Sequence, residues 1–491
     1  MISSVKSLTN RTVILLFSLL VCLYTLPIIL TGRLYIDDLG RTLYGYAGWG
    51  LNGRPLSDVI MQAMSLGGEL LDLSPLTQII SVFVLCLALY YYTRRNFTGI
   101  SLAGAMTVSF LFIANPFYIE NLSYKFDSLT MALSMVLLML PYTVTEKKSI
   151  NSLLSVILII ASLSLYQASI GLFAILAVIE AAVVKSDRSN KEVFYSIAQR
   201  VIQLAVAFVL YKIVIASNFV KDDYNVTHSE MVKISSDSIP VIIDNIHNLS
   251  WFLKSYLSTI PTTLRMVVVA AIAYSVLRMS FDLCREGYKK HIISILLVLF
   301  SPALVVILAL IPLVILKSPV FAPRVLLALS GAIMLYGFMI FRSVKHPVIL
   351  AVIFVPLVWI NFVYGYSFAS ASRSQGETDR LIASSVFQDA LHSGEAFKYV
   401  TVSGEMPKSR QLLMAENKLP LMSKLVPVYL NYDWVWGSEL LNHYGMSLEF
   451  KVLGSEKGNL ICKGKLISKG NVYSLYSYNN ILIIDFLNIK C

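Results

Sequence analysis

Long apolar runs separated by short polar segments dominate the first three quarters of the chain. The hydrocarbon core of a bilayer is about 30 Å thick, so a spanning helix needs roughly 20 mostly apolar residues. Counted this way, the runs predict about eleven spanning helices and a polytopic α-helical membrane protein. The expected helices are residues 12–31, 75–93, 98–115, 128–145, 150–166, 168–184, 194–217, 262–279, 291–316, 324–341 and 347–369. Only YQAS separates the fifth run from the sixth, so these two also fit one re-entrant pair.

The composition and the first apolar run agree with a membrane protein. The chain is 56% hydrophobic and 14% charged. Its mean hydropathy of +0.70 lies above that of a water-soluble chain of this size. The run 12–31 exceeds the apolar core of a signal peptide, and no A-x-A-like site follows it. We therefore expect it to be a retained helix.

The positive charges predict the topology. The net charge of +11 is divided among short clusters between apolar runs, which does not fit a patch for nucleic acid. Because Lys and Arg concentrate in cytoplasmic loops, we expect the N-terminus inside and the longer, less basic loops 32–74 and 218–261 outside. With eleven crossings the C-terminus is outside too. The cytoplasmic clusters are Lys6 with Arg11, Arg94/Arg95, Lys147/Lys148, Lys185/Arg188/Lys191, Arg278/Arg285/Lys289/Lys290 and Arg342/Lys345.

The last quarter of the chain differs from the rest. Residues 370–491 hold no further apolar run, and the stretches FKYVTVSG, VPVYLNY, LEFKVL and VYSLYSY alternate as strands do. They predict a small α/β domain outside the membrane, beside a transmembrane bundle formed by residues 1–369. Segment 372–391 is expected to be a helical hinge between the two. Loop 218–261 has apolar residues at helical spacing, which predicts helices lying along the membrane surface.

The first outer loop carries the strongest candidate chemistry, in the sequence YIDDLGRTLYGYAGWGLNGRPLSD. Two adjacent carboxylates, Asp37 and Asp38, stand where the first apolar run ends, a costly position for charge. Either could accept a proton, while nearby arginines can bind a phosphate in bidentate fashion. Aromatic rings suit sugars, and the glycines predict tight turns. The expected substrate-binding residues of this loop are Arg41, Tyr44, Trp49 and Arg54.

Two further outer loops also carry candidate catalytic or substrate-binding residues. NPFYIENLSYKFDS, residues 115–128, places the acids Glu120 and Asp127 between two apolar runs, as a possible base and its orienting partner. Tyr124 and Lys125 of the same loop are expected to contact substrate. In KSPVFAPRV, the cations Lys317 and Arg324 stand at the mouth of the bundle, where they can hold a lipid phosphate.

Other site types find little support. The six histidines are scattered without ligand spacing, so no metal is expected. No Walker A, G-x-G-x-x-G or G-x-S-x-G motif indicates a nucleotide or serine-hydrolase site, and no cofactor is expected. Cys462 and Cys491 in the tail leave open both a disulfide and two free thiols.

The order of YIDDLGRTLYGYAGWGLNGRPLSD, NPFYIENLSYKFDSLTMALS, SLYQASIG and YGYSFASASRSQGETDR resembles the phage-encoded, serotype-converting O-antigen glucosyltransferases. The resemblance covers residues 12 to about 390; the tail matches in position and size alone. It implies a C-type membrane glycosyltransferase fold at the periplasmic face of a bacterial inner membrane. Asp37 and Asp38 match the acidic motif after the first helix of C-type enzymes, and Glu120 and Asp127 match the second-loop acids. The match does not fix which acid is the base.

The resemblance also implies the partners. The donor would be undecaprenyl-phosphate glucose and the acceptor a sugar, commonly rhamnose, of the lipid-linked O-antigen. Membrane lipids and proteins that make and flip the donor would be further partners. Direct attack would invert the anomeric centre, so a β-linked donor would give an α-glucoside. A transporter or flippase of polyprenyl-linked glycans and an O-antigen polymerase remain alternatives.

Overall fold

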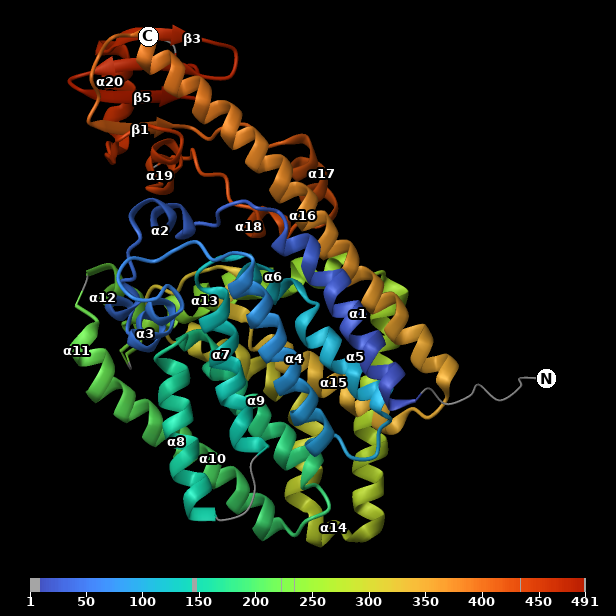
Figure 1. Cartoon of the computed structure of the whole chain (residues 1–491). Helices are drawn as coiled ribbons and strands as arrows, with labels where there is room; N and C mark the ends of the chain where they lie inside the picture. The colour runs from blue at the N-terminus through green and yellow to red at the C-terminus, as the bar shows by residue number, and fades with distance from the viewer. Residues whose placement is uncertain (1–8, 144–147, 222, 234, 433, 490–491) are drawn as a thin grey trace.

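The computed structural model describes residues 9–489 apart from 144–147, 222, 234 and 433 (Figure 1). Helices make up a large bundle, and a small five-stranded sheet lies beyond it at the end of one long helix. The first part of the bundle consists of α1 (Asn10–Ile29), α2 (Asp38–Tyr44), the 3-10 helix η1 (Trp49–Asn52), α3 (Pro55–Met64), α4 (Leu76–Asn96), α5 (Leu102–Ile113), α6 (Pro116–Ser123) and α7 (Ser128–Met139).

The second part of the bundle completes the apolar core. Its main helices are α8 (Lys148–Leu163), α9 (Ile170–Ile179), α10 (Asn190–Leu210), α11 (Ser217–Phe219), α12 (Asp223–Ser229), α13 (Ser238–Thr259), α14 (Thr262–Val314), the 3-10 turn η6 (Pro323–Leu326), α15 (Leu329–Ser343) and α16 (Pro347–His392). Two π-helical segments, Glu180–Val184 and Tyr211–Ala216, extend α9 and α10. Short 3-10 turns stand at Leu140–Tyr142 and Gln167–Ser169.

Six helices in the described part of the chain are long and apolar enough to cross a membrane, or up to seven if a bent pair counts as one span. That pair is α5 and α6, which meet at 62°. Asn115 causes the break, because its side chain caps the N–H of Phe117 and Pro116 starts the new helix. The expected loop 115–128 is therefore mostly helix. The number of crossings, eleven, stays a prediction.

Two long helices each contain more than one predicted feature. α14 combines the expected runs 262–279 and 291–316 across a kink, where Gly287 has φ 130° and His291 leaves helical geometry. α16 spans 46 residues, about 69 Å at 1.5 Å per residue. The expected boundary at 369 and the expected hinge 372–391 both lie inside this unbroken helix, which carries the chain from the bundle to the sheet (Figure 1).

The tail forms an α/β unit, as its alternating stretches predict. Its sheet has the order β2-β1-β5-β4-β3, with β1 parallel to both neighbours and β4 antiparallel to both of its own. The strands are β1 (Tyr399–Ser403), β2 (Glu449–Phe450), β3 (Lys465–Lys469), β4 (Ser474–Tyr478) and β5 (Ile481–Asp485). The helices are α17 (Arg410–Lys418), α18 (Met422–Leu425), α19 (Trp436–His443) and α20 (Lys457–Lys463).

One predicted strand of the tail is wrong. VPVYLNY forms no strand, because its polar groups bond to the first outer loop instead. The Tyr429 hydroxyl donates to the Leu34 carbonyl at 2.7 Å and accepts from the Ile36 N–H at 3.0 Å. β5, whose residues are all buried, was missed in the sequence, because a run without alternation carries no period-2 signal. The Cys462–Cys491 disulfide that the sequence leaves open involves Cys491, which lies outside the described residues.

Candidate active site

The first outer loop folds as its glycines predict. Gly45, Gly48 and Gly53 have φ values of 62°, 77° and 73°, a region open to glycine at little cost. Gly45 ends α2, and the other two flank η1. Asp58 of α3 closes the turn, because its carboxylate accepts the N–H groups of Trp49 at 2.8 Å and of Gly50 at 2.6 Å. These hydrogen bonds and turns hold the loop in one conformation.

Asp38 connects the first outer loop to the residues that follow α6. It is fully buried, and its carboxylate accepts the backbone N–H groups of Tyr35 at 3.1 Å, Lys125 at 2.9 Å and Phe126 at 3.3 Å. Burial raises the pKa of Asp38 to about 7, and the N–H groups of Lys125 and Tyr35 offset part of that rise. A carboxylate enclosed by backbone donors holds two loops together and is not reachable by a sugar hydroxyl.

Asp37 is the accessible acid of the pair. Its side chain is 34% exposed and lies 3.5 Å from Nη1 of Arg41, one helical turn further. The neighbours Asp37 and Asp38 therefore have different environments, one open and paired with a cation, the other enclosed. Of the four predicted acids, Asp37 alone has a side chain more than 2% exposed.

Asp127 organises the cations around Asp37. Its Oδ1 accepts the indole N–H of Trp49 at 2.7 Å and lies 3.4 Å from Arg54, and its Oδ2 lies 3.3 Å from Arg41. The Arg41 guanidinium also stacks on the Trp49 ring, 4.1 Å from its centroid. Within the described part of the chain, Nε and Nη1 of Arg41 are buried without a hydrogen-bond acceptor. Nη1 nevertheless lies within 3.5 Å of both Asp37 and Asp127, and the Arg41 side chain is 4% exposed, so Arg41 is a buried charge beside Asp37 and not an open anion ligand.

Glu120 pairs with a third cation, Arg324. Its carboxylate accepts the backbone N–H of Arg324 at 2.8 Å and the side-chain Nη1 of the same residue at 2.5 Å. Glu120 is 1% exposed, whereas the Arg324 side chain is 23% exposed and lies over the Tyr124 ring at 5.8 Å. Tyr124 in turn packs edge-on against Tyr35 at 4.9 Å. Glu120 is thus a support for Arg324 and not an acid open to solvent.

The remaining predicted residues lie at the edge of the cluster or away from it. Tyr44 is 56% exposed, and its hydroxyl accepts from the Asn442 side chain of α19 at 3.3 Å. Lys125 pairs with Asp72 at 2.9 Å. Lys317 is exposed and pairs with Glu230 at 3.1 Å, and none of its described contacts joins it to the cluster.

The tail contributes residues that the sequence did not indicate. Arg33 forms a buried ion pair with Asp379 of α16 at 2.7 Å, and its guanidinium lies 4.7 Å from the Tyr429 ring centroid. Glu439 of α19 lies beside Tyr44, and burial raises its pKa while the Tyr44 hydroxyl lowers it. These partners stand hundreds of positions from the loop, so no spacing motif could have found them.

Among the described residues no group of three or more His, Cys, Asp or Glu could hold a metal ion. The arrangement instead offers one open carboxylate beside cations. A carboxylate can take a proton from a hydroxyl, and guanidinium groups can stabilise a leaving phosphate.

The comparisons with known proteins place this chain in the GtrII glucosyltransferase family. The family described as "Glucosyl transferase GtrII" matches residues 26–341, which include the acidic cluster formed by Asp37, Asp38, Glu120 and Asp127. The chain belongs to that family, and the resemblance drawn from its motifs is confirmed. A relative in Salmonella phage P22, an uncharacterised 55.3 kDa protein in the region 5′ of gtrB, is 30% identical over 489 residues. That match covers 97% of this chain and 99% of the relative. No solved structure matches.

Proposed function

We propose that the chain transfers glucose from undecaprenyl-phosphate glucose to a sugar of the lipid-linked O-antigen, with rhamnose as the first choice of acceptor. Membership of a glucosyltransferase family favours this over transport or flipping of a polyprenyl-linked glycan. It also favours a single-sugar donor over the oligosaccharide donor of a polymerase. The reaction takes place at the periplasmic face of a bacterial inner membrane, in a C-type bundle with about eleven crossings.

The observation that carries the mechanism is the different exposure of the four acids. Asp37 is open beside Arg41, whereas Asp38, Glu120 and Asp127 are buried and bonded to backbone or cations. We assign Asp37 as the general base. The other three acids position the loops and guanidinium groups around it.

The proposed step conserves atoms and charge. Asp37 takes the proton of an acceptor hydroxyl, and the hydroxyl oxygen forms a bond to the anomeric carbon of glucose. The bond between that carbon and the phosphate oxygen breaks, and its electron pair leaves with undecaprenyl phosphate. Arg324, whose side chain is 23% exposed, contacts the phosphate as it departs, and the buried positive charge of Arg41 stabilises the phosphate at longer range. Attack from the opposite side inverts the anomeric centre, so a β-linked donor gives an α-glucoside.

The test is glucose transfer by the purified full chain from undecaprenyl-phosphate glucose to lipid-linked O-antigen. Asp37→Asn should lower the rate about 10²-fold or more, the usual contribution of a general base. Asp72→Asn is a matched control, since Asp72 lies in the same loop, is 27% exposed and also has one cation partner. Full activity of a folded Asp37→Asn variant contradicts the assigned base. Absence of transfer by the unmodified chain with its donor and acceptor contradicts the function.

A further inference from the structure

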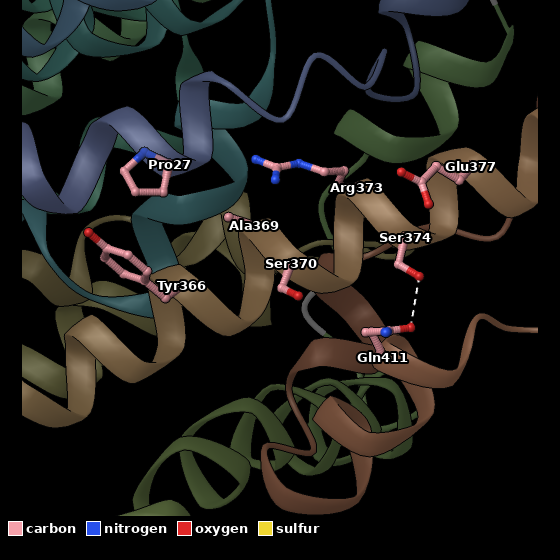
Figure 2. A pocket seen from close by; sticks show the side chains of 8 residues that line it. All are labelled: Pro27, Tyr366, Ala369, Ser370, Arg373, Ser374, Glu377 and Gln411. Atoms are coloured by element: carbon pink, nitrogen blue, oxygen red, sulfur yellow. Dashed lines mark hydrogen bonds between the residues drawn. The ribbon is translucent and has the colours of Figure 1, made fainter.

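A polar cavity lies beside α16, separate from the acidic cluster. It has a volume of about 390 Å³ and is lined by Tyr366, Ser370, Arg373, Ser374 and Glu377 of α16, together with Pro27 of α1 and Gln411 of α17 (Figure 2). Ser374 donates to Gln411 at 2.9 Å, which fixes the wall formed by the tail. None of these residues has a part in the proposed transfer step.

The cavity stands where one face of α16 changes from apolar to polar. Trp359 and Tyr366, seven residues apart, are 68% and 47% exposed, and the same helical face continues with Ser370, Arg373 and Glu377. Trp and Tyr are enriched where a membrane meets water. On α1, Leu23 and Leu26 are 45% and 42% exposed, and Leu30, which follows the helix, is 60% exposed. The cavity therefore opens at the depth of lipid headgroups.

The charged side chains of the cavity indicate which class of ligand it can bind. Arg373 is exposed and forms no ion pair with any residue in the described ranges. Figure 2 shows its guanidinium extended between α1 and α16 toward Ala369. A guanidinium with free N–H groups matches the oxygens of a phosphate. Glu377, one turn further along α16, disfavours a bare phosphate but accepts from an amine or hydroxyl beyond it.

We infer that this cavity binds the headgroup of a membrane lipid, with a phosphodiester held by Arg373 and Ser370 and an amine or hydroxyl group held by Glu377. The inference rests on the membrane placement of α1 and α16 under the proposed function, but not on glucose transfer. Two kinds of lipid have this chemistry: those whose headgroup carries an amine, such as phosphatidylethanolamine, and those whose headgroup carries hydroxyls, such as a polyprenyl-phosphate sugar.

The experiment uses the full chain in nanodiscs that contain both lipids. A photo-crosslinking benzophenone side chain at Tyr366 captures what occupies the cavity, and mass spectrometry identifies the adduct. Arg373→Gln should lower the yield about tenfold, because a charge-assisted hydrogen bond contributes enough for such a change in affinity. Arg410→Gln, an exposed arginine on the adjacent α17, should leave the yield unchanged. A benzophenone at Tyr274 of α14, which is 51% exposed, reports bulk lipid independent of Arg373.

Glu377→Gln separates the two lipids. An amine headgroup loses its charge partner and its adduct falls, whereas a sugar hydroxyl still finds the amide oxygen and its adduct persists. A yield at Tyr366 that Arg373→Gln does not lower overturns the inference. Asp37→Asn keeps the adduct while it lowers the rate of transfer about 10²-fold or more, so failure of this site and failure of the proposed function are distinguishable.

Discussion

Nη1 of Arg41 lies 3.3 Å from Oδ2 of Asp127, and both side chains are at most 4% exposed. This buried ion pair joins α2, which lies within the first outer loop, to the end of the second outer loop at the start of α7. It also sets the position of the guanidinium beside Asp37. The geometry around the proposed base therefore depends on a carboxylate that no substrate needs to touch.

Asp127→Asn is expected to destabilise the protein. The substitution leaves Arg41 and Arg54 facing a neutral amide in a buried cluster, and removal of one partner of a buried pair costs about 3–5 kcal/mol. The midpoint of thermal unfolding in detergent measures the effect. Asp72→Asn breaks the more exposed pair with Lys125 and should cost about 1 kcal/mol or less. Equal midpoints for the two variants would contradict the role given to Asp127.

Asp38→Asn is expected to remove a pH dependence. The pKa of Asp38 is about 7 in the folded protein, against an ordinary value of 3.8. The folded protein keeps this proton to higher pH than the unfolded chain does. The free energy of unfolding therefore falls as pH rises from 3.8 to about 7, by up to about 1.4 kcal/mol per pH unit, and is level above.

The measurement for Asp38 is the difference in unfolding midpoint between the unmodified chain and Asp38→Asn from pH 4.5 to 8. Other titrating groups cancel in that difference, so a slope that ends near pH 7 is the expected result. A difference that does not change with pH would mean that the carboxyl of Asp38 titrates near its ordinary value.

Arg33→Gln is expected to weaken the packing of the tail against the first outer loop and α16. Arg33 and Asp379 are 5% and 3% exposed, and Arg33 also donates to the Pro427 carbonyl at 2.5 Å. Loss of the cation leaves Asp379 buried without its partner, at a cost of about 3–5 kcal/mol. Limited proteolysis should then cleave within residues 419–444 at an increased rate. Arg278→Gln breaks an exposed pair with Asp282, and its cleavage pattern should match that of the unmodified chain.

Arg324→Lys is expected to weaken donor binding. Lysine keeps the charge but loses the planar fork that reaches Glu120 and a phosphate at once. We expect the KM for undecaprenyl-phosphate glucose to rise about tenfold, the loss of one charge-assisted hydrogen bond. Lys317→Gln is the comparison, because Lys317 pairs with Glu230 outside the cluster. A larger effect at Lys317 than at Arg324 would reverse the assignment of the two predicted cations.

Local signals in the sequence were sufficient for several features. Apolar run length located the helices, and alternation located β1 and β4. The glycines of the first outer loop predicted its turns, which Gly45, Gly48 and Gly53 form. Run length could not locate the bend between α5 and α6, where a capping residue and a proline interrupt an apolar stretch. It also could not show that α16 continues past residue 369, because helix length in the tail depends on packing against α17 and α19.

The sequence by itself placed this chain among the GtrII glucosyltransferases and located apolar helices compatible with a membrane protein, with acids and cations gathered in the segments between them. Apolar periodicity and contiguous motifs are properties of neighbouring residues, so they can be read along the chain. Only the tertiary structure decided which acid is open. Asp37 and Asp38 are adjacent and identical in the sequence, yet one faces Arg41 and solvent while the other is enclosed by N–H groups. Those groups come from residues 125 and 126, and burial by distant segments is what separates the two carboxylates.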